Sequence, residues 1–146
     1  MNIGRFKDLM DTHLEKQFDD QNINGDGYQN AAPFPHVVME SFLPQNIMEQ
    51  ILKEFPPMNS DTWSSQYVNV NENKRASDKF FKWGPCTQLL FIYLNSKPFL
   101  ERVEKLTGIP KLIPDPYYLG GGLHCLPMLL LIAGPCRESL SCDSVP

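Results

Sequence analysis

The stretch PDPYYLGGGLHCLPM, residues 114–128, places three consecutive glycines among apolar and aromatic residues. Glycine inside a strand-like segment is typical of a bulge, or of a position where another backbone or a ligand approaches closely. The glycines do not open a helix, because Pro127 follows too soon, so a phosphate-binding loop of the usual type is not indicated. From these residues alone we expect a bulge or close backbone packing within a sheet, and a strand, a turn and a second strand over residues 111–128.

Two helices are predicted in the first part of the chain, where apolar residues recur at helical spacing. One covers residues 3–18 and the other covers residues 44–55. The second would begin at Pro44 and must end at Pro56–Pro57, because proline cannot continue a helix. The apolar stripes are formed by Ile3, Phe6, Met10, Leu14 and Phe18, and by Ile47, Met48, Ile51, Leu52 and Phe55.

Two further helices are predicted over residues 87–95 and 97–107. Ser96 stands at the N-cap of the second of these, and Gly108 stands where a left-handed residue commonly ends a helix. The face of that helix expected to be buried consists of Phe99, Leu100, Val103 and Leu106.

Strand signals are weaker and more scattered. Residues 34–42 predict a strand of about seven residues between flanking prolines. A short strand is indicated at residues 66–70, and the polar residues 19–33 are expected to form a loop. Helices combined with a few strands, without internal repeats, indicate an α+β fold.

Composition narrows the classes of partner. The net charge of −4 over 146 residues argues against non-specific binding to nucleic acid, which requires a basic face. The apolar run at residues 125–135 is far shorter than the roughly 20 residues of a membrane-spanning helix. The first 18 residues lack the continuous apolar core of a signal peptide, so a cytoplasmic protein without a membrane partner is expected.

The four cysteines are Cys86, Cys125, Cys136 and Cys142. No CxxC pair occurs, so a structural zinc site is not indicated. A disulfide between Cys136 and Cys142 is possible from their spacing, but reduced thiols are expected because no export signal is seen.

One polar segment has part of the pattern of a calcium-binding loop. Asn22, Asn24, Asp26 and Gly27 occupy the first, third, fifth and sixth positions of an EF-hand loop. The twelfth position should be a bidentate Glu but is Pro33, so a turn-rich loop is expected instead.

The histidines do not assemble an obvious metal site. His13 and Glu15 match H-x-E, but residues two apart on a helix point in different directions and cannot reach one ion together. His36 is expected to be a hydrogen-bonded residue at a strand end.

Three blocks of sequence, in this order, resemble the N-terminal part of an Fe(II)/2-oxoglutarate-dependent oxygenase of the prolyl 4-hydroxylase-like kind. They are PFPHVVMESFLP (residues 33–44), LNSKPFLERVEKLTGI (residues 94–109) and LIPDPYYLGGGLH (residues 112–124). The resemblance divides the chain into an N-terminal helix and loop (residues 1–31), a partial oxygenase-like domain (residues 32–128) and a divergent tail (residues 129–146). It implies helices followed by the first strands of an incomplete double-stranded β-helix, or jelly roll.

The resemblance also implies Fe(II) and 2-oxoglutarate as cofactors. In the family an H-x-D motif and a later His hold the iron, and a basic residue beyond them holds the 2-oxoglutarate carboxylate. In this sequence no His follows His124, Asp143 has no H-x before it, and Arg137 lies in the divergent tail and takes no assigned role. No catalytic or metal-binding residue is therefore assigned, and His124 is a candidate for lining the pocket.

These departures predict a chain that does not bind the two cofactors and does not catalyse hydroxylation as it stands. A truncation or a shifted reading frame is expected at the tail, with a genuinely divergent C-terminus as the alternative. The alternative function is a non-enzymatic binding or regulatory module derived from the family, and a structural fragment without a role of its own is a third possibility. The substrate of an active relative would be a peptide or a small molecule.

Overall fold

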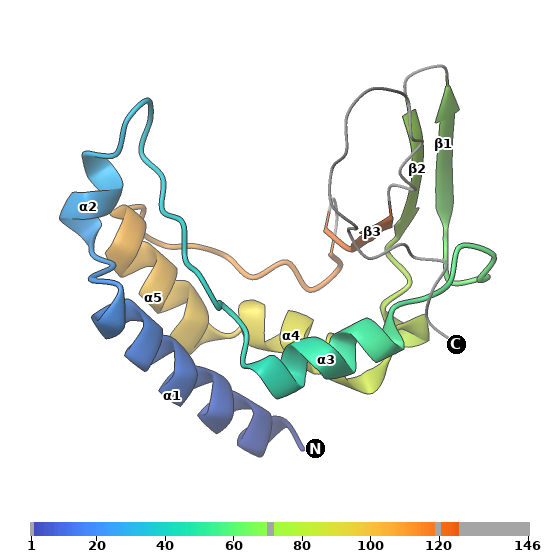
Figure 1. The fold of residues 1–146 in the computed structure, drawn as a ribbon, viewed down its shortest axis with the longest axis horizontal. Helices are drawn as coiled ribbons and strands as arrows, with labels where there is room; N and C mark the ends of the chain where they lie inside the picture. The colour runs from blue at the N-terminus through green and yellow to red at the C-terminus, as the bar shows by residue number, and fades with distance from the viewer. Residues whose placement is uncertain (1, 70–71, 119–120, 126–146) are drawn as a thin grey trace, which may run out of the picture.

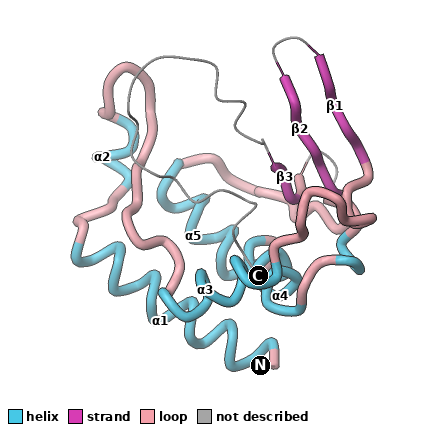
Figure 2. The backbone as a smooth tube through the Cα atoms, turned by 45° about the vertical axis from the view of Figure 1, so that its right-hand side comes forward, coloured by secondary structure: helices cyan, strands magenta, loops and turns pink. Residues whose placement is uncertain are grey.

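The computed structural model describes residues 2–69, 72–118 and 121–125, and within them the fold is mixed α+β, as predicted (Figure 1). The elements in chain order are α1 (Ile3–Asp20), α2 (Gly25–Gln29), α3 (Gln45–Glu54), β1 (Ser65–Asn69), β2 (Glu72–Ser77), the 3-10 turn η1 (Phe80–Lys82), α4 (Pro85–Leu94), α5 (Lys97–Thr107) and β3 (Leu123–Cys125). The helices form one side of the molecule and the small sheet stands at the other side (Figure 2).

The hydrophobic core lies among the helices. Phe6, Met10 and Leu14 of α1 are fully buried, which confirms the middle of the predicted face, whereas Ile3 at its start is 47% exposed. The buried cluster consists of Phe6, Met10, Leu14, Ile47, Cys86 and Tyr93. The rings of Phe6 and Tyr93 meet edge to face with their centroids 6.3 Å apart, which is a favoured aromatic geometry.

A polar network at the edge of this core joins α1, α4 and α5. The Tyr93 hydroxyl donates a hydrogen bond to Asp11 over 2.7 Å, and the Arg102 guanidinium donates to both the Asp11 carboxylate and the Tyr93 oxygen. Arg102 also forms an ion pair with Glu15 at 3.6 Å. Burial and the neighbouring Asp11 carboxylate raise the pKa of Tyr93, so this hydroxyl remains a donor at neutral pH.

The helix ends follow the predicted signals with small differences. Pro44 is the N-cap of α3 rather than its first helical residue, and α3 stops at Glu54 before the proline pair. Ser96 is the N-cap of α5 as predicted, but its hydroxyl makes no capping hydrogen bond. Gly108 takes the left-handed conformation at φ 74°, as expected for the residue that ends α5.

The sheet is antiparallel in the order β1-β2-β3. Arg75 of β2 lies opposite Gln66 of β1 and Cys125 of β3, so these three residues project from one face of the sheet. On β3, Leu123 and Cys125 are buried and His124 is exposed, which is the alternation of a strand with one covered face.

The strand predicted for residues 34–42 is wrong, because no strand forms there. The Gln21 side chain hydrogen-bonds to both backbone groups of Glu40, and the His13 ring bonds to the Ser41 carbonyl. The backbone in this segment therefore pairs with side chains of α1 and its C-cap instead of a neighbouring strand. Phe34, Val37 and Val38 are exposed, Val38 to 76%, so they do not mark a buried strand face, whereas Phe42 packs against the helical core.

Other differences concern elements that the patterns missed or overstated. The predicted loop at residues 19–33 contains the short helix α2, and the polar strand β2 was not predicted. Residues 111–118 form no strand; there the backbone N–H groups of Leu112 and Asp115 donate to side chains of Glu104 and Asn95. The predicted short strand at residues 66–70 is confirmed as β1 within the described residues.

The close approach suggested by the glycine run is to another strand. Gly122 has φ 148°, and a Cβ atom at this position would overlap the carbonyl group of Ser77 at the end of β2. Gly122 thus allows β3 to begin pairing at Ser77. Among the described glycines of the run, Gly121 has ordinary space, with Tyr118 O 3.8 Å from its would-be Cβ.

We expect Gly122→Ala to lower the free energy of unfolding by about 2 kcal/mol or more, because a strained φ alone costs about 1–3 kcal/mol and the overlap with Ser77 adds to it. Gly121→Ala is the matched control and should stay within about 0.5 kcal/mol of the parent. Urea unfolding compares the stabilities, and amide hydrogen exchange follows the β2–β3 pairing. Equal effects of the two substitutions would contradict the role given to Gly122.

Candidate functional site

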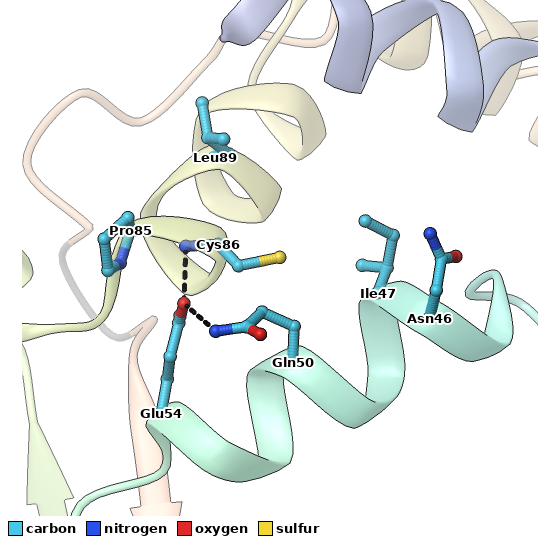
Figure 3. Close-up of a pocket in the computed structure, with 7 residues that line it drawn as sticks. All are labelled: Asn46, Ile47, Gln50, Glu54, Pro85, Cys86 and Leu89. Atoms are coloured by element: carbon cyan, nitrogen blue, oxygen red, sulfur yellow. Dashed lines mark hydrogen bonds between the residues drawn. The ribbon is translucent and has the colours of Figure 1, made fainter. Parts of the chain in front are cut away.

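A pocket lies between α3 and α4, with a volume of about 390 Å³. Side chains from the two helices face each other across it (Figure 3). Its lining residues are Asn46, Ile47, Gln50, Glu54, Pro85, Cys86 and Leu89. The thiol of Cys86 points from α4 toward α3 in this view, and the carboxylate of Glu54 reaches from α3 to the start of α4.

The Glu54 carboxylate caps the N-terminus of α4. One oxygen accepts from the backbone N–H of Cys86 at 3.0 Å, and the other accepts from the N–H of Thr87 at 2.9 Å and from its hydroxyl at 3.0 Å. These N–H groups would otherwise lack partners, because the first N–H groups of a helix have no acceptor within it. The negative charge also lies at the positive end of the α4 dipole, where carboxylates are stabilised.

The protonation equilibria in the pocket agree with a structural role. Burial raises the pKa of Glu54, but the hydrogen bonds from Thr87, Gln50 and Cys86 together lower it below its usual value. Burial and the adjacent Glu54 carboxylate raise the pKa of the Cys86 thiol. A thiol with a raised pKa is a poor nucleophile at neutral pH.

Glu54 was not singled out by the sequence patterns. Its position contains one signal, since a carboxylate in the last turn of a helix opposes the helix dipole and is unfavourable without an outside partner. The outside partner is the start of α4, more than 30 residues further along the chain. Only the folded structure identifies this pairing.

His124, the predicted pocket-lining residue, lies on the exposed face of the sheet. Ala76 is opposite it on β2, and its side chain projects away from the buried Leu123 and Cys125. His124 does not line the pocket between α3 and α4. Its assignment to a cofactor pocket stays a prediction.

The face of the sheet that carries Ser77 and Cys125 is covered at one end by the segment that precedes β1. The Ser77 hydroxyl donates to the Thr62 carbonyl at 2.6 Å and accepts from the Trp83 indole N–H at 3.1 Å. The Cys125 thiol lies 3.3 Å from the Met58 sulfur. Ordinary packing and hydrogen bonds therefore fill this end of the face.

The residues that suggested a calcium loop serve other purposes. The Asn24 side chain caps α2 by accepting from the Gly27 N–H at 2.8 Å, and its amide donates to the Asn22 carbonyl. Asp26 lies in the first turn of the same short helix. The pattern therefore matches a helix cap and turn.

The histidines of the N-terminal half have separate partners. His13 bonds to the Ser41 carbonyl at 2.7 Å, whereas Glu15 pairs with Arg102, so H-x-E is not a shared site. The His36 ring lies 2.8 Å from the Phe34 carbonyl, but in a loop rather than at a strand end.

Within residues 2–69, 72–118 and 121–125, no group of three or more His, Cys, Asp or Glu side chains is placed to hold a metal ion. Several sequence predictions lie outside these residues, namely those on Pro127, Cys136, Arg137, Cys142 and Asp143 and on the tail at residues 129–146. None of the helices in the described part is long and apolar enough to cross a bilayer.

Comparison of the chain with protein-family models, with curated proteins and with solved structures gave no significant match.

Proposed function

We propose that this chain corresponds to the N-terminal portion of an Fe(II)/2-oxoglutarate-dependent oxygenase of the prolyl 4-hydroxylase-like kind. The observation that carries the proposal is the order of the three sequence blocks at residues 33–44, 94–109 and 112–124. Helices that precede an antiparallel strand in the third block are compatible with it. The same proposal includes an incomplete jelly-roll fold, whose further strands would follow the described sheet. It also includes a cytoplasmic location.

The residues of this sequence do not fit the iron site of that family. Such a site needs two histidines and a carboxylate on one face, with H-x-D supplying two of the three ligands. The sequence has no H-x-D, and no His beyond His124. The chain as given would therefore neither hold Fe(II) in this way nor turn over 2-oxoglutarate, and hydroxylation would require the missing ligands.

Two measurements test this proposal. Purified chain, incubated anaerobically with Fe(II), should show no stoichiometric iron binding, and in air with 2-oxoglutarate it should form no succinate above the protein-free background. Translation of the coding DNA downstream of Met128 in the other two frames should reveal H-x-D and a later His. Tight iron binding or enzyme-dependent succinate would show that the chain is active, and frames without those residues would remove the link to an active parent gene.

A second function, that of a non-enzymatic binding module, is favoured by exposed apolar side chains. Phe81 is 92% exposed and Ile113 is 87% exposed. Side chains of this kind can contribute to a protein interface. An intact reading frame through the tail, together with a partner whose affinity falls for Phe81→Ser, would support this function over the first.

A further inference from the structure

Arg75 of β2 has a guanidinium nitrogen for which no described residue supplies an acceptor. Its Nε atom is shielded from solvent and has no acceptor within hydrogen-bonding distance among the described residues. Arg75 also takes part in none of the ion pairs formed in this part of the chain, which all involve Lys7, Lys82, Lys97 or Arg102. A desolvated donor without an acceptor is unfavourable, and such groups are rare in native proteins.

The register places Arg75 beside a second donor. Gln66 of β1 lies directly opposite Arg75, and both side chains project from the face that also carries Cys125. Residues opposite each other in an antiparallel pair have Cβ atoms about 4.5–5.5 Å apart, so both groups can reach one small ligand. Gln66 is exposed and Arg75 is intermediate in exposure, so this part of the row reaches solvent, although the Arg75 Nε itself is shielded and Cys125 is buried.

The next position on this face of β2, Ser77, is already covered by other residues. Ser77, two residues from Arg75, is fully buried and hydrogen-bonded to Thr62 and Trp83. Val68, on the same face of β1, is 64% exposed. Among the described residues, Arg75 thus lies at the boundary between the covered and the exposed part of this face.

We infer that Arg75 and Gln66 form a binding subsite for a carboxylate group. A guanidinium presents Nε–H and Nη–H as a planar fork that matches the two oxygens of a carboxylate. One cation and one neutral amide balance the single negative charge of a carboxylate, whereas a doubly charged phosphate would remain undercompensated. Binding would require the Arg75 side chain to rotate so that Nε reaches the ligand, and the new hydrogen bond would then satisfy a donor that no described residue pairs with.

The subsite is tested with acetate as the probe, in the full chain and without iron or 2-oxoglutarate. We expect the side-chain Nε–H signal of Arg75 to shift saturably in a 1H–15N NMR titration at constant ionic strength. Arg75→Lys keeps the charge but removes the fork, and it should weaken acetate binding about 10-fold or more, as measured on the backbone amides of β1 and β2. The matched control is Lys74→Gln, which removes one charge from the opposite face of the same strand and should leave the affinity unchanged.

A third variant distinguishes a binding role of Arg75 from a structural one. Arg75→Met should unfold at the same or a higher urea concentration than the parent, because it deletes a buried donor that no described residue pairs with. Destabilisation by Arg75→Met in acetate-free buffer would show a structural role and overturn the inference. So would an equal response to chloride, a stronger response to phosphate than to acetate, or unchanged acetate affinity in Arg75→Lys. The result is independent of the oxygenase proposal, because neither cofactor takes part.

Discussion

Replacing Phe6 by alanine should lower the free energy of unfolding by about 3–5 kcal/mol, the range found when a buried aromatic ring is deleted. Phe6 is fully buried on α1 and meets the ring of Tyr93 on α4. Its removal leaves a cavity at the contact between these helices, which the surrounding side chains can fill only in part. Urea unfolding followed by far-UV circular dichroism measures the loss.

The matched control is Ile3→Ala on the same helix. Ile3 is 47% exposed, so its truncation removes little buried area and should cost about 1 kcal/mol or less. Comparable losses for the two variants would contradict the placement of the core along the face of α1 that carries Phe6.

Replacing Glu54 by alanine should lower the free energy of unfolding by about 1–3 kcal/mol, because three donors at the start of α4 lose their acceptors. Glu54→Gln should cost less, since one amide oxygen can still accept. Glu49→Ala, at an exposed position of the same helix, is the control and should be near neutral. Urea unfolding at pH 7 distinguishes the three variants, and an equal loss for Glu49→Ala would contradict the capping role.

The Glu54 cap also predicts a pH dependence. Because its folded pKa lies below its usual value near 4.5, the stabilisation is fully present above the unfolded pKa. It is lost as pH falls from about 4.5 through the lower, folded pKa. Stability measured from about pH 7 to about pH 3 should therefore fall less steeply in Glu54→Ala than in the parent, and parallel profiles would show that Glu54 is not coupled to folding.

Gly84 provides an independent check on the same contact. A Cβ atom on Gly84 would overlap the Glu54 side chain, so Gly84→Ala should displace the carboxylate from α4. Because Gly84→Ala and Glu54→Ala disturb the same interaction, their losses of unfolding free energy should not be additive. A double-mutant cycle in which Gly84→Ala costs as much in the Glu54→Ala background as in the parent would contradict this coupling.

The helices could be predicted from the sequence because their signals are local. Apolar residues at helical spacing mark the buried face of α1, the proline pair ends α3, and Gly108 ends α5. The sheet was harder to predict because β2 contains the polar residues ENKRAS, and its pairing depends on two other strands. The apolar residues between prolines at residues 34–42 suggested a strand, but the backbone of Glu40 there bonds to the Gln21 side chain instead of a neighbouring strand.

The candidate sites were even harder to predict from the sequence than the sheet. The glycine run correctly indicated a close backbone approach, but only the fold identified Ser77 as the neighbour. Arg75 and Glu54 have no motif around them, because their significance depends on what lies opposite them in space. The family resemblance predicts chemistry that the described residues do not test.

The hydrogen bonds between Glu54 and the start of α4 also determine how the chain tolerates changes of length. They hold residues 54 and 86 close together, so the segment between them forms a loop whose two ends meet at the helical layer. The entropic cost of closing a loop depends only weakly on its length, since doubling a flexible loop costs about 0.6 kcal/mol more. The β1–β2 hairpin within it can therefore be lengthened, shortened or exchanged during evolution while the helical layer is retained, provided that β2 keeps its pairing with β3.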